Sequence, residues 1–296
     1  MHVALRQAVT TLFLASHGCP QTGAGGAEPT RLFDAPERVS IRGHEGDAME
    51  PFVTRDGRFL LFNNRNDPSE NTNLHLAERV DDLTFDYRGE LPGVNTAALE
   101  GVPTMDRDGA FYFVSPRSYR DTLSTIYRGT FRNGRIDDVA LVPGVSPRQA
   151  GIVDFDVEVS PDGHTLYVAE GRFVAGNPLP QSADIVVFER RESGFERRPD
   201  TKRVMQNVNT ADLEYAACIS ADGLTLFFTR AGKTMAGSPA ILVAARKSKD
   251  AAFDEPRHLA AIEGFVEAPT LSPEERSLYF HKRDGRRFVL YRVTRR

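Results

Sequence analysis

A tight polar turn that runs into an alternating apolar strand recurs along this chain and constrains its fold more than any other feature. The clearest copy occupies residues 160–168, where Ser-Pro-Asp-Gly precedes His-Thr-Leu-Tyr-Val. Related copies occupy residues 54–62, 106–113, 220–228 and 272–280. The first acidic turn residues, Asp56, Asp108, Asp162, Asp222 and Glu274, stand 52, 54, 60 and 52 residues apart. A regular step of this length between strand-rich units predicts propeller blades.

Each unit predicts four antiparallel strands. Asp-Gly forms the hairpin because glycine tolerates positive φ and aspartate bonds its own backbone two residues on. A short strand precedes each turn and a more apolar strand follows it, and a third strand comes next. Weaker fourth strands are predicted at residues 84–90, 137–142, 195–205 and 256–261. The predicted fold is an all-β, five-bladed β-propeller with four-stranded antiparallel blades.

Ser160 to Gly163, followed by Leu166 to Val168, resembles the WD40-like propeller repeat of the TolB type, often called PD40. Prolines five residues before the turn marker recur at Pro51, Pro103 and Pro269. The resemblance covers residues 31–296, and the last copy departs from it with Glu274-Glu275 in place of Asp-Gly. It implies a propeller but no activity, because such repeats occur in binding proteins, in non-catalytic domains of peptidases and in accessory envelope proteins.

Residues 1–30 are predicted to be a leader and a flexible tether. Arg6 before the apolar run at 8–15 is typical of a short signal peptide, and this run is far shorter than the ~20 residues that span a bilayer. Residues 16–19 resemble a bacterial lipobox at Gly18 and Cys19 but not at the two preceding positions. The predicted location is periplasmic or extracellular, with or without a lipid anchor at Cys19. A misassigned start codon would make the protein cytoplasmic.

Residues 31–296 are predicted to form one domain, because no second hydrophobic pattern interrupts them. The net charge is -4, with 37 basic and 41 acidic residues interspersed, which argues against nucleic acid as a partner. Membrane contact is expected only through lipidation of Cys19. Cys218 is expected to be a small buried residue, so no disulfide framework is predicted.

The last unit lacks a fourth strand, since the chain ends at Arg296 soon after its third strand at 287–294. Residues 37–43 alternate correctly and precede the first unit. We expect them to close the ring as the outer strand of the last blade, which would remove an exposed strand edge.

Charged residues gather where inner strands begin and second strands end, at one face of the predicted disc. The acidic members are Glu50, Glu100, Asp154, Asp156, Glu214 and Glu267. The basic members are Arg65, Arg117, Arg172, Arg230, Lys282 and Arg283, with His281 beside them. They can pair as structural ion pairs. Alternatively, the carboxylates ring the channel mouth and bind a cation or the cationic group of a protein or small-molecule ligand.

Asp154, Asp156 and Glu158 suggest a calcium site. Residues two apart on a strand share a face, so three carboxylates would line up and repel one another unless compensated. Ca²⁺ prefers oxygen ligands of this kind. The alternative is compensation by arginines such as Arg172 and Arg117.

A second duplication pairs residues 94–100 with 208–214, each containing Asn-Thr, and predicts either a rim binding feature or a repeated Asx or ST turn. Catalytic motifs are absent from the sequence, including nucleophile elbows, zinc helices and phosphate loops. The sequence therefore favours a non-catalytic binding or scaffolding propeller of the bacterial envelope. The alternative is a five-bladed glycoside hydrolase with paired carboxylates at the same mouth. The chain contains no Trp, the usual sugar platform, which counts against this alternative.

Overall fold

A computed structural model describes residues 32–66, 71–175, 177, 179–233 and 238–296. The predicted leader and tether, with Cys19, lie outside the described residues. Within them the fold is almost entirely β, with two short helices, α2 (Tyr119–Thr122) and α3 (Thr201–Val204). None of the helices in these ranges has the length and apolarity that crossing a membrane requires.

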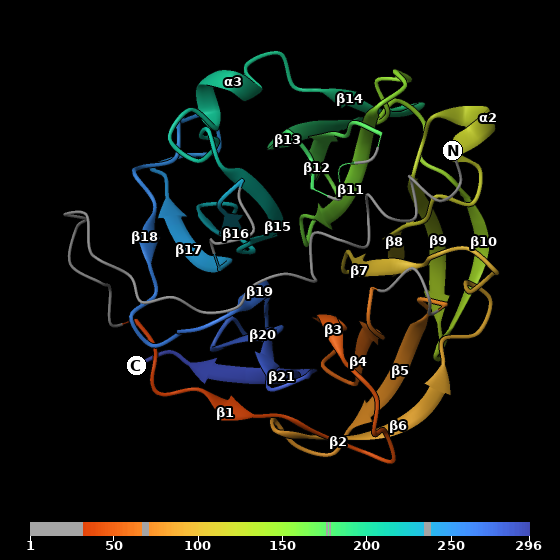
Figure 1. The fold of residues 1–296 in the computed structure, drawn as a ribbon, viewed down its shortest axis with the longest axis vertical. Helices are drawn as coiled ribbons and strands as arrows, with labels where there is room; N and C mark the ends of the chain where they lie inside the picture. Colours follow the sequence, from red (N-terminus) through yellow and green to blue (C-terminus); the bar gives the residue numbers. More distant parts are fainter. Residues whose placement is uncertain (1–31, 67–70, 176, 178, 234–237) are drawn as a thin grey trace.

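The five repeats form antiparallel strand groups arranged around a common centre (Figure 1). The first contains β3 (Met49–Val53), β4 (Phe59–Asn63), β5 (Leu74–Arg79) and β6 (Thr84–Glu90). The second contains β7 (Gly101–Met105), β8 (Ala110–Val114), β9 (Ile126–Arg132) and β10 (Arg135–Leu141). The third contains β11 (Ile152–Val159), β12 (Thr165–Arg172), β13 (Ser182–Arg191) and β14 (Gly194–Arg197).

The fourth group contains β15 (Leu213–Ile219), β16 (Thr225–Ala231), β17 (Ala240–Ala245) and β18 (Arg257–His258). The fifth contains β19 (Val266–Leu271), β20 (Ser277–Asp284) and β21 (Arg287–Thr294). The inner strands β3, β7, β11, β15 and β19 pack against one another in sequence, and β19 also packs against β3. We call the side where inner strands begin the loop face and the side with the Asp-Gly hairpins the turn face.

The segment predicted as one outer strand, residues 37–43, serves two repeats. β1 (Glu37–Arg38) pairs antiparallel with β21, whereas β2 (Ser40–Arg42) pairs parallel with β6. Val39 lies between them, is buried, and donates its N–H to Leu290 O at 2.9 Å. The chain thus passes from the last repeat to the first at a buried valine.

Two predicted fourth strands are shorter than expected. Within 195–205, β14 ends at Arg197 and α3 begins at Thr201, because Pro199 has no N–H to offer the strand ladder. Within 256–261 only the two residues of β18 pair with β17. By contrast, β6 occupies residues 84–90 as predicted.

The polar turn is held by the side chains that the repeat preserves. In the third repeat, Ser160 Oγ donates to Asp162 Oδ1 at 2.6 Å and accepts from Thr165 N at 2.9 Å, while Gly163 adopts φ 72°. The last repeat has Glu275 at the glycine position with φ 57°, a left-handed conformation that costs a residue with a Cβ on the order of 1 kcal/mol. The departure from Asp-Gly therefore changes the turn locally and leaves the hairpin in place.

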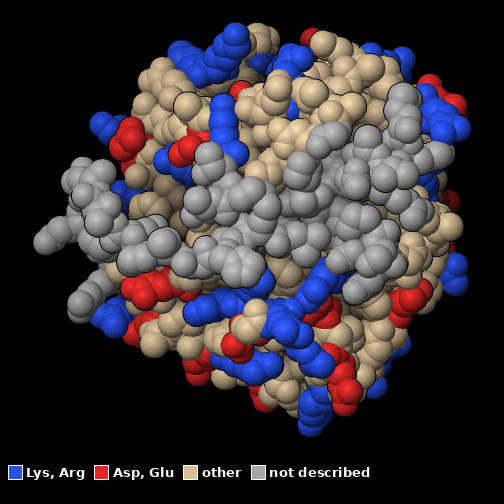
Figure 2. All heavy atoms as spheres, in the orientation of Figure 1, with Lys and Arg blue, Asp and Glu red and all other residues tan. Residues whose placement is uncertain are grey.

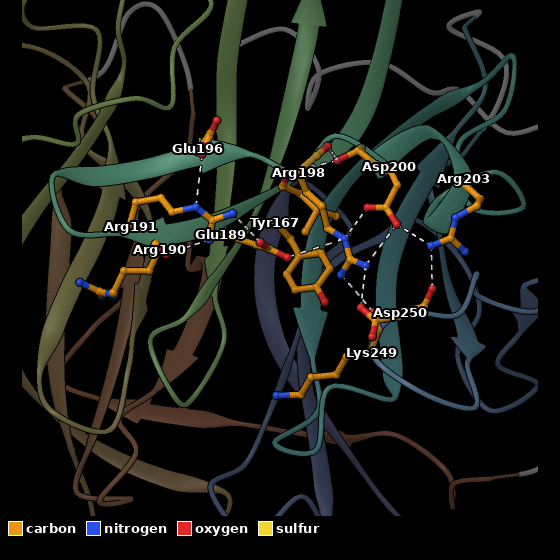
Figure 3. Close-up of polar contacts among 12 residues, drawn as sticks. Tyr167, Glu189, Arg190, Arg191, Glu196, Arg198, Asp200, Arg203, Lys249 and Asp250 are labelled. Atoms are coloured by element: carbon orange, nitrogen blue, oxygen red, sulfur yellow. Dashed lines mark hydrogen bonds and ion pairs between the residues drawn. The ribbon is translucent and has the colours of Figure 1, made fainter.

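An ion-pair network joins the third and fourth repeats at the outer rim (Figure 3). Arg198, with a side chain only 12% exposed, binds Asp250 at 2.9 Å and also contacts Asp200. Arg203 reaches the same Asp200 and donates to Asp250 O at 2.8 Å. Shared carboxylates and a nearly buried guanidinium make this a structural network rather than an open site.

Phe33 offers a test of how the N-terminal segment holds the repeats together. It is 2% exposed and packs edge-on against Phe227 with ring centroids 6.1 Å apart, in a cluster drawn from the fourth and fifth repeats. Phe33→Ala should lower the free energy of unfolding by about 3 to 5 kcal/mol, as measured by urea denaturation. The neighbouring Leu32 is 40% exposed, so Leu32→Ala should change it by less than about 1 kcal/mol. Equal effects of the two substitutions would contradict this role.

Candidate functional site

A bulge interrupts every inner strand near the loop face. The register with the second strand shifts between Met49 and Phe52, Gly101 and Thr104, Asp154 and Asp156, Tyr215 and Cys218, and Glu267 and Thr270. Glu50, Val102, Ala216 and Ala268 within these bulges have positive φ. A bulge redirects the side chains that follow it, so the bulges decide which residues face the central channel.

The channel between the inner strands is nearly filled. Residues 50–52, 102–103, 156–158, 216–217 and 268–270 line a cavity of about 30 Å³. This volume accommodates a water molecule but not a sugar. The carboxyl groups of Glu50, Asp156 and Glu158 lie here and are no more than 5% exposed.

Glu267, Tyr215 and His281 form a buried polar chain beside this cavity. The Tyr215 hydroxyl donates to Glu267 Oε1, and His281 Nε2 lies 3.0 Å from Glu267 Oε2. Glu50 N donates to His281 Nδ1 at 3.2 Å, so the ring proton is on Nε2 and points at Glu267. Burial raises the pKa of Glu267 to about 8, against the opposing effect of the tyrosine bond, and lowers the pKa of His281 to about 3.

At the other channel carboxyls, the charges of neighbouring carboxylates raise the pKa in addition to burial. Burial, and then the charge of Glu267, raise the pKa of Glu50 well above its usual range. Burial, followed by the charges of Glu50 and Glu158, does the same at Asp156. Glu158 differs from these two in having a cation beside it, since Arg55 reaches it from the turn face at 3.5 Å. No sequence pattern singled out Arg55, because it belongs to a hairpin on the opposite face.

Two of the carboxylates predicted at the loop face form structural ion pairs. Glu100 binds Arg117 at 3.0 Å and Glu214 binds Arg230 at 2.7 Å, and both carboxylates are fully buried. The pairing interpretation is confirmed at these two positions.

The Asn-Thr duplication supports these pairs. Thr96 Oγ1 donates to Glu100 Oε1 at 2.7 Å and accepts from Ala98 N at 3.1 Å, which makes an ST turn. Thr210 makes the equivalent contact with Glu214 at 2.6 Å. The Asn95 side chain accepts a hydrogen bond from Leu74 N at 2.8 Å and donates one to Leu74 O at 2.9 Å, in the preceding repeat. The duplicated segment therefore joins adjacent repeats.

The remaining predicted residues are dispersed. Arg65 pairs with Asp47 rather than with Glu50, Arg172 is exposed, and Lys282 lies over the Tyr291 ring at 5.6 Å. In the face shown in Figure 2, acidic and basic side chains are interspersed over the described residues. The expected continuous ring of carboxylates at an open mouth is not what the described residues form.

The predicted alignment of Asp154, Asp156 and Glu158 is wrong, because the bulge between the two aspartates breaks the alternation of side chains. Asp156 lies near Glu50 and Glu158, whereas the charges that act on Asp154 are those of Glu170 and Arg197. Among the residues that the structure describes, no three His, Cys, Asp or Glu side chains are grouped to hold a metal. Cys218 is buried and free, as expected.

The raised pKa values of the buried carboxyls predict that the stability of the protein falls as the pH rises. Between its usual value and about 8, Glu267 keeps a proton in the folded protein that the unfolded chain has released. The free energy of unfolding should therefore fall as the pH rises from 6.5 to 8.5, with each such group contributing on the order of 1 kcal/mol. His281 acts only below about 6.5, where its contribution is lost as the pH falls. Urea unfolding across this pH range measures the slope.

Glu267→Gln should flatten this slope, because the amide can still accept from Tyr215 but does not titrate. Glu192→Gln, at an exposed position, is the matched control and should leave the slope unchanged. A slope in Glu267→Gln equal to that of the wild type would mean that Glu267 ionises normally.

Comparisons with known proteins support the fold and leave the activity open. A scan against protein-family models found no match, and no curated protein matches the chain. The catalytic domain of the Coprinopsis cinerea GH62 alpha-L-arabinofuranosidase matches with a TM-score of 0.53 and 11% identity, covering 90% of this chain and 98% of that one. The Podospora anserina alpha-L-arabinofuranosidase PaAbf62A matches with a TM-score of 0.52 and 10% identity, covering 89% and 96%.

A TolB structure from Acinetobacter baumannii has a TM-score of 0.48 and 14% identity, and the match covers 85% of this chain and 55% of that one. Membership of the PD40 repeat family stays a prediction. At these identities the two arabinofuranosidase matches concern the fold alone. The chain has an all-β, propeller-like fold.

Proposed function

We propose that this chain is a five-bladed propeller, closed by β1 on β21, that acts as a non-catalytic binding or scaffolding module of the bacterial envelope. The cyclic packing of the inner strands, from β3 through β19 and back to β3, supports the closed ring. A periplasmic or extracellular location is part of the proposal and rests on the leader predicted for residues 1–30. The ligand is a protein or a small molecule bound at the loop face.

The closed channel is the observation that carries the non-catalytic assignment. A glycosidase needs two carboxyls flanking a sugar, about 5 to 10 Å apart and open to the substrate. Here Glu50, Asp156 and Glu267 are at most 4% exposed, and the cavity beside them holds about 30 Å³. Glu100 and Glu214 are neutralised by arginines. The arrangement supports carboxyls that stabilise the channel rather than carboxyls that act on a substrate.

The loop face is the better surface for a partner. Loops held by a rigid scaffold are where binding residues concentrate. Arg172 is exposed at the loop-face end of β12, and α2 adds the exposed Arg120. The turn face, by contrast, consists of short hairpins fixed by their own side chains.

A pair of charge reversals tests the assignment of the binding face. Envelope proteins cross-linked to the purified protein should be lost in Arg172→Glu, at the loop face, and retained in Arg107→Glu, at an exposed position of a turn-face hairpin. Both variants should keep the wild-type melting temperature, because neither residue is buried. Loss in Arg107→Glu alone would place the partner on the opposite face.

The same preparation tests the absence of catalysis. We expect no hydrolysis of a panel of aryl glycosides, arabinofuranosides included, above the rate in buffer. Hydrolysis that disappears in both Asp156→Asn and Glu267→Gln would overturn the proposal and assign the activity to the channel carboxyls.

A further inference from the structure

The third repeat departs from its neighbours at the position where they bury an ion pair. In the fourth repeat, Glu214 lies opposite Arg230 on the next strand and binds it at 2.7 Å. In the second repeat, Arg117 reaches Glu100 from the end of the second strand. The third repeat has Asp154 on the inner strand, but the residue opposite is Glu170.

The acidic row continues across a third strand. Glu170 on β12 lies opposite Asp184 on β13. Directly opposed residues share one face of a sheet, with Cβ atoms about 5 Å apart, so Asp154, Glu170 and Asp184 form a row of carboxyls. The row runs from the interior to solvent, because Asp154 is 2% exposed, the Glu170 side chain is 22% exposed and Asp184 is exposed.

Among the described residues, Arg197 and Lys233 act on this row, and neither forms an ion pair with Asp154 at the inner end. Arg197 on β14 binds Glu170, in the middle of the row. Asp154 Oδ1 is buried without a hydrogen-bond partner, and it is the one carboxylate oxygen in this condition among the described residues. Burial first, and then the charge of Glu170, raise the pKa of Asp154 to about 8, against the opposing effect of Arg197. A buried carboxyl without a partner is costly, and natural structures rarely leave one unless something else completes it.

We infer that this row, Asp154, Glu170 and Asp184, receives the guanidinium of an arginine side chain from a binding partner. The inference rests on the proposed binding function and names the chemistry that the loop face recognises. The incoming arginine would take the place that Arg230 and Arg117 occupy in the neighbouring repeats. A guanidinium suits a row of carboxyls that ends at a buried one, since it donates two parallel hydrogen bonds and has a long apolar stem.

A compact metal ion fits this row poorly. Its carboxyls are spread over three strands, and the described residues contain no set of three ligands placed around one point. An elongated cation can instead contact Asp184 and Glu170 along its path and reach Asp154 with its end.

The probe is N-acetyl-L-arginine amide, with the neutral N-acetyl-L-citrulline amide as its isosteric control. At pH 8.5 the arginine probe should raise the melting temperature of the full chain, and the citrulline probe should not. Because binding at lower pH must expel the proton from Asp154, affinity should fall about tenfold per pH unit below 8. A response that is equal for the two probes, or independent of pH, would overturn the inference.

Three variants locate the response. Asp154→Asn keeps the shape of the side chain and should abolish the arginine response. Glu170→Arg places an arginine opposite Asp154, as in the fourth repeat, and should abolish it too. Glu192→Arg makes the same change of charge at an exposed position and should keep it. A response that survives in Asp154→Asn refutes the inference, whereas the proposed function would still stand if Arg172→Glu alone abolished cross-linking.

Discussion

The bulge in each inner strand is the constraint on which the charged interior of this molecule depends. Five strands converge on one axis, and each has an unpaired residue close to the loop face. The bulge reorients the side chains beside it, so that carboxyls near different bulges reach different surroundings. Glu50 and Asp156 therefore face the channel, whereas Glu100 and Glu214 stay at the rim beside arginines.

The carboxyls at the rim and those in the channel are stabilised in different ways. At the loop-face end an arginine, a threonine hydroxyl and a backbone N–H all donate to one carboxylate, as at Glu214. In the channel Arg55 pairs with Glu158, whereas burial and neighbouring like charges raise the pKa of Glu50 and Asp156 and so favour their neutral forms. A neutral carboxyl packed in this way costs far less than a buried anion, which is why the channel can be both acidic in composition and stable.

The sequence predicted the repeats, their hairpins and most strands because each depends on local chemistry. Ser160, Asp162 and Gly163 define a turn by contacts within a few residues, and β6 begins and ends where the alternation does. The bulges depend on convergence of distant strands and leave no local pattern. Relative to its turn marker, Glu100 stands eight residues earlier, Glu267 seven and Glu50 six, so residues that look equivalent in the sequence occupy three different environments.

The third repeat lacks the internal ion pair that its neighbours have at the same position. Its bulge has no positive-φ residue, unlike those of the other four, and its inner aspartate faces Glu170 instead of an arginine. The second and fourth repeats have an internal ion pair at this position. The fold itself therefore does not require an acidic row here. An unpartnered, buried Asp154 lowers the stability of the free protein at neutral to alkaline pH, and that cost is recovered only when a cation completes the row.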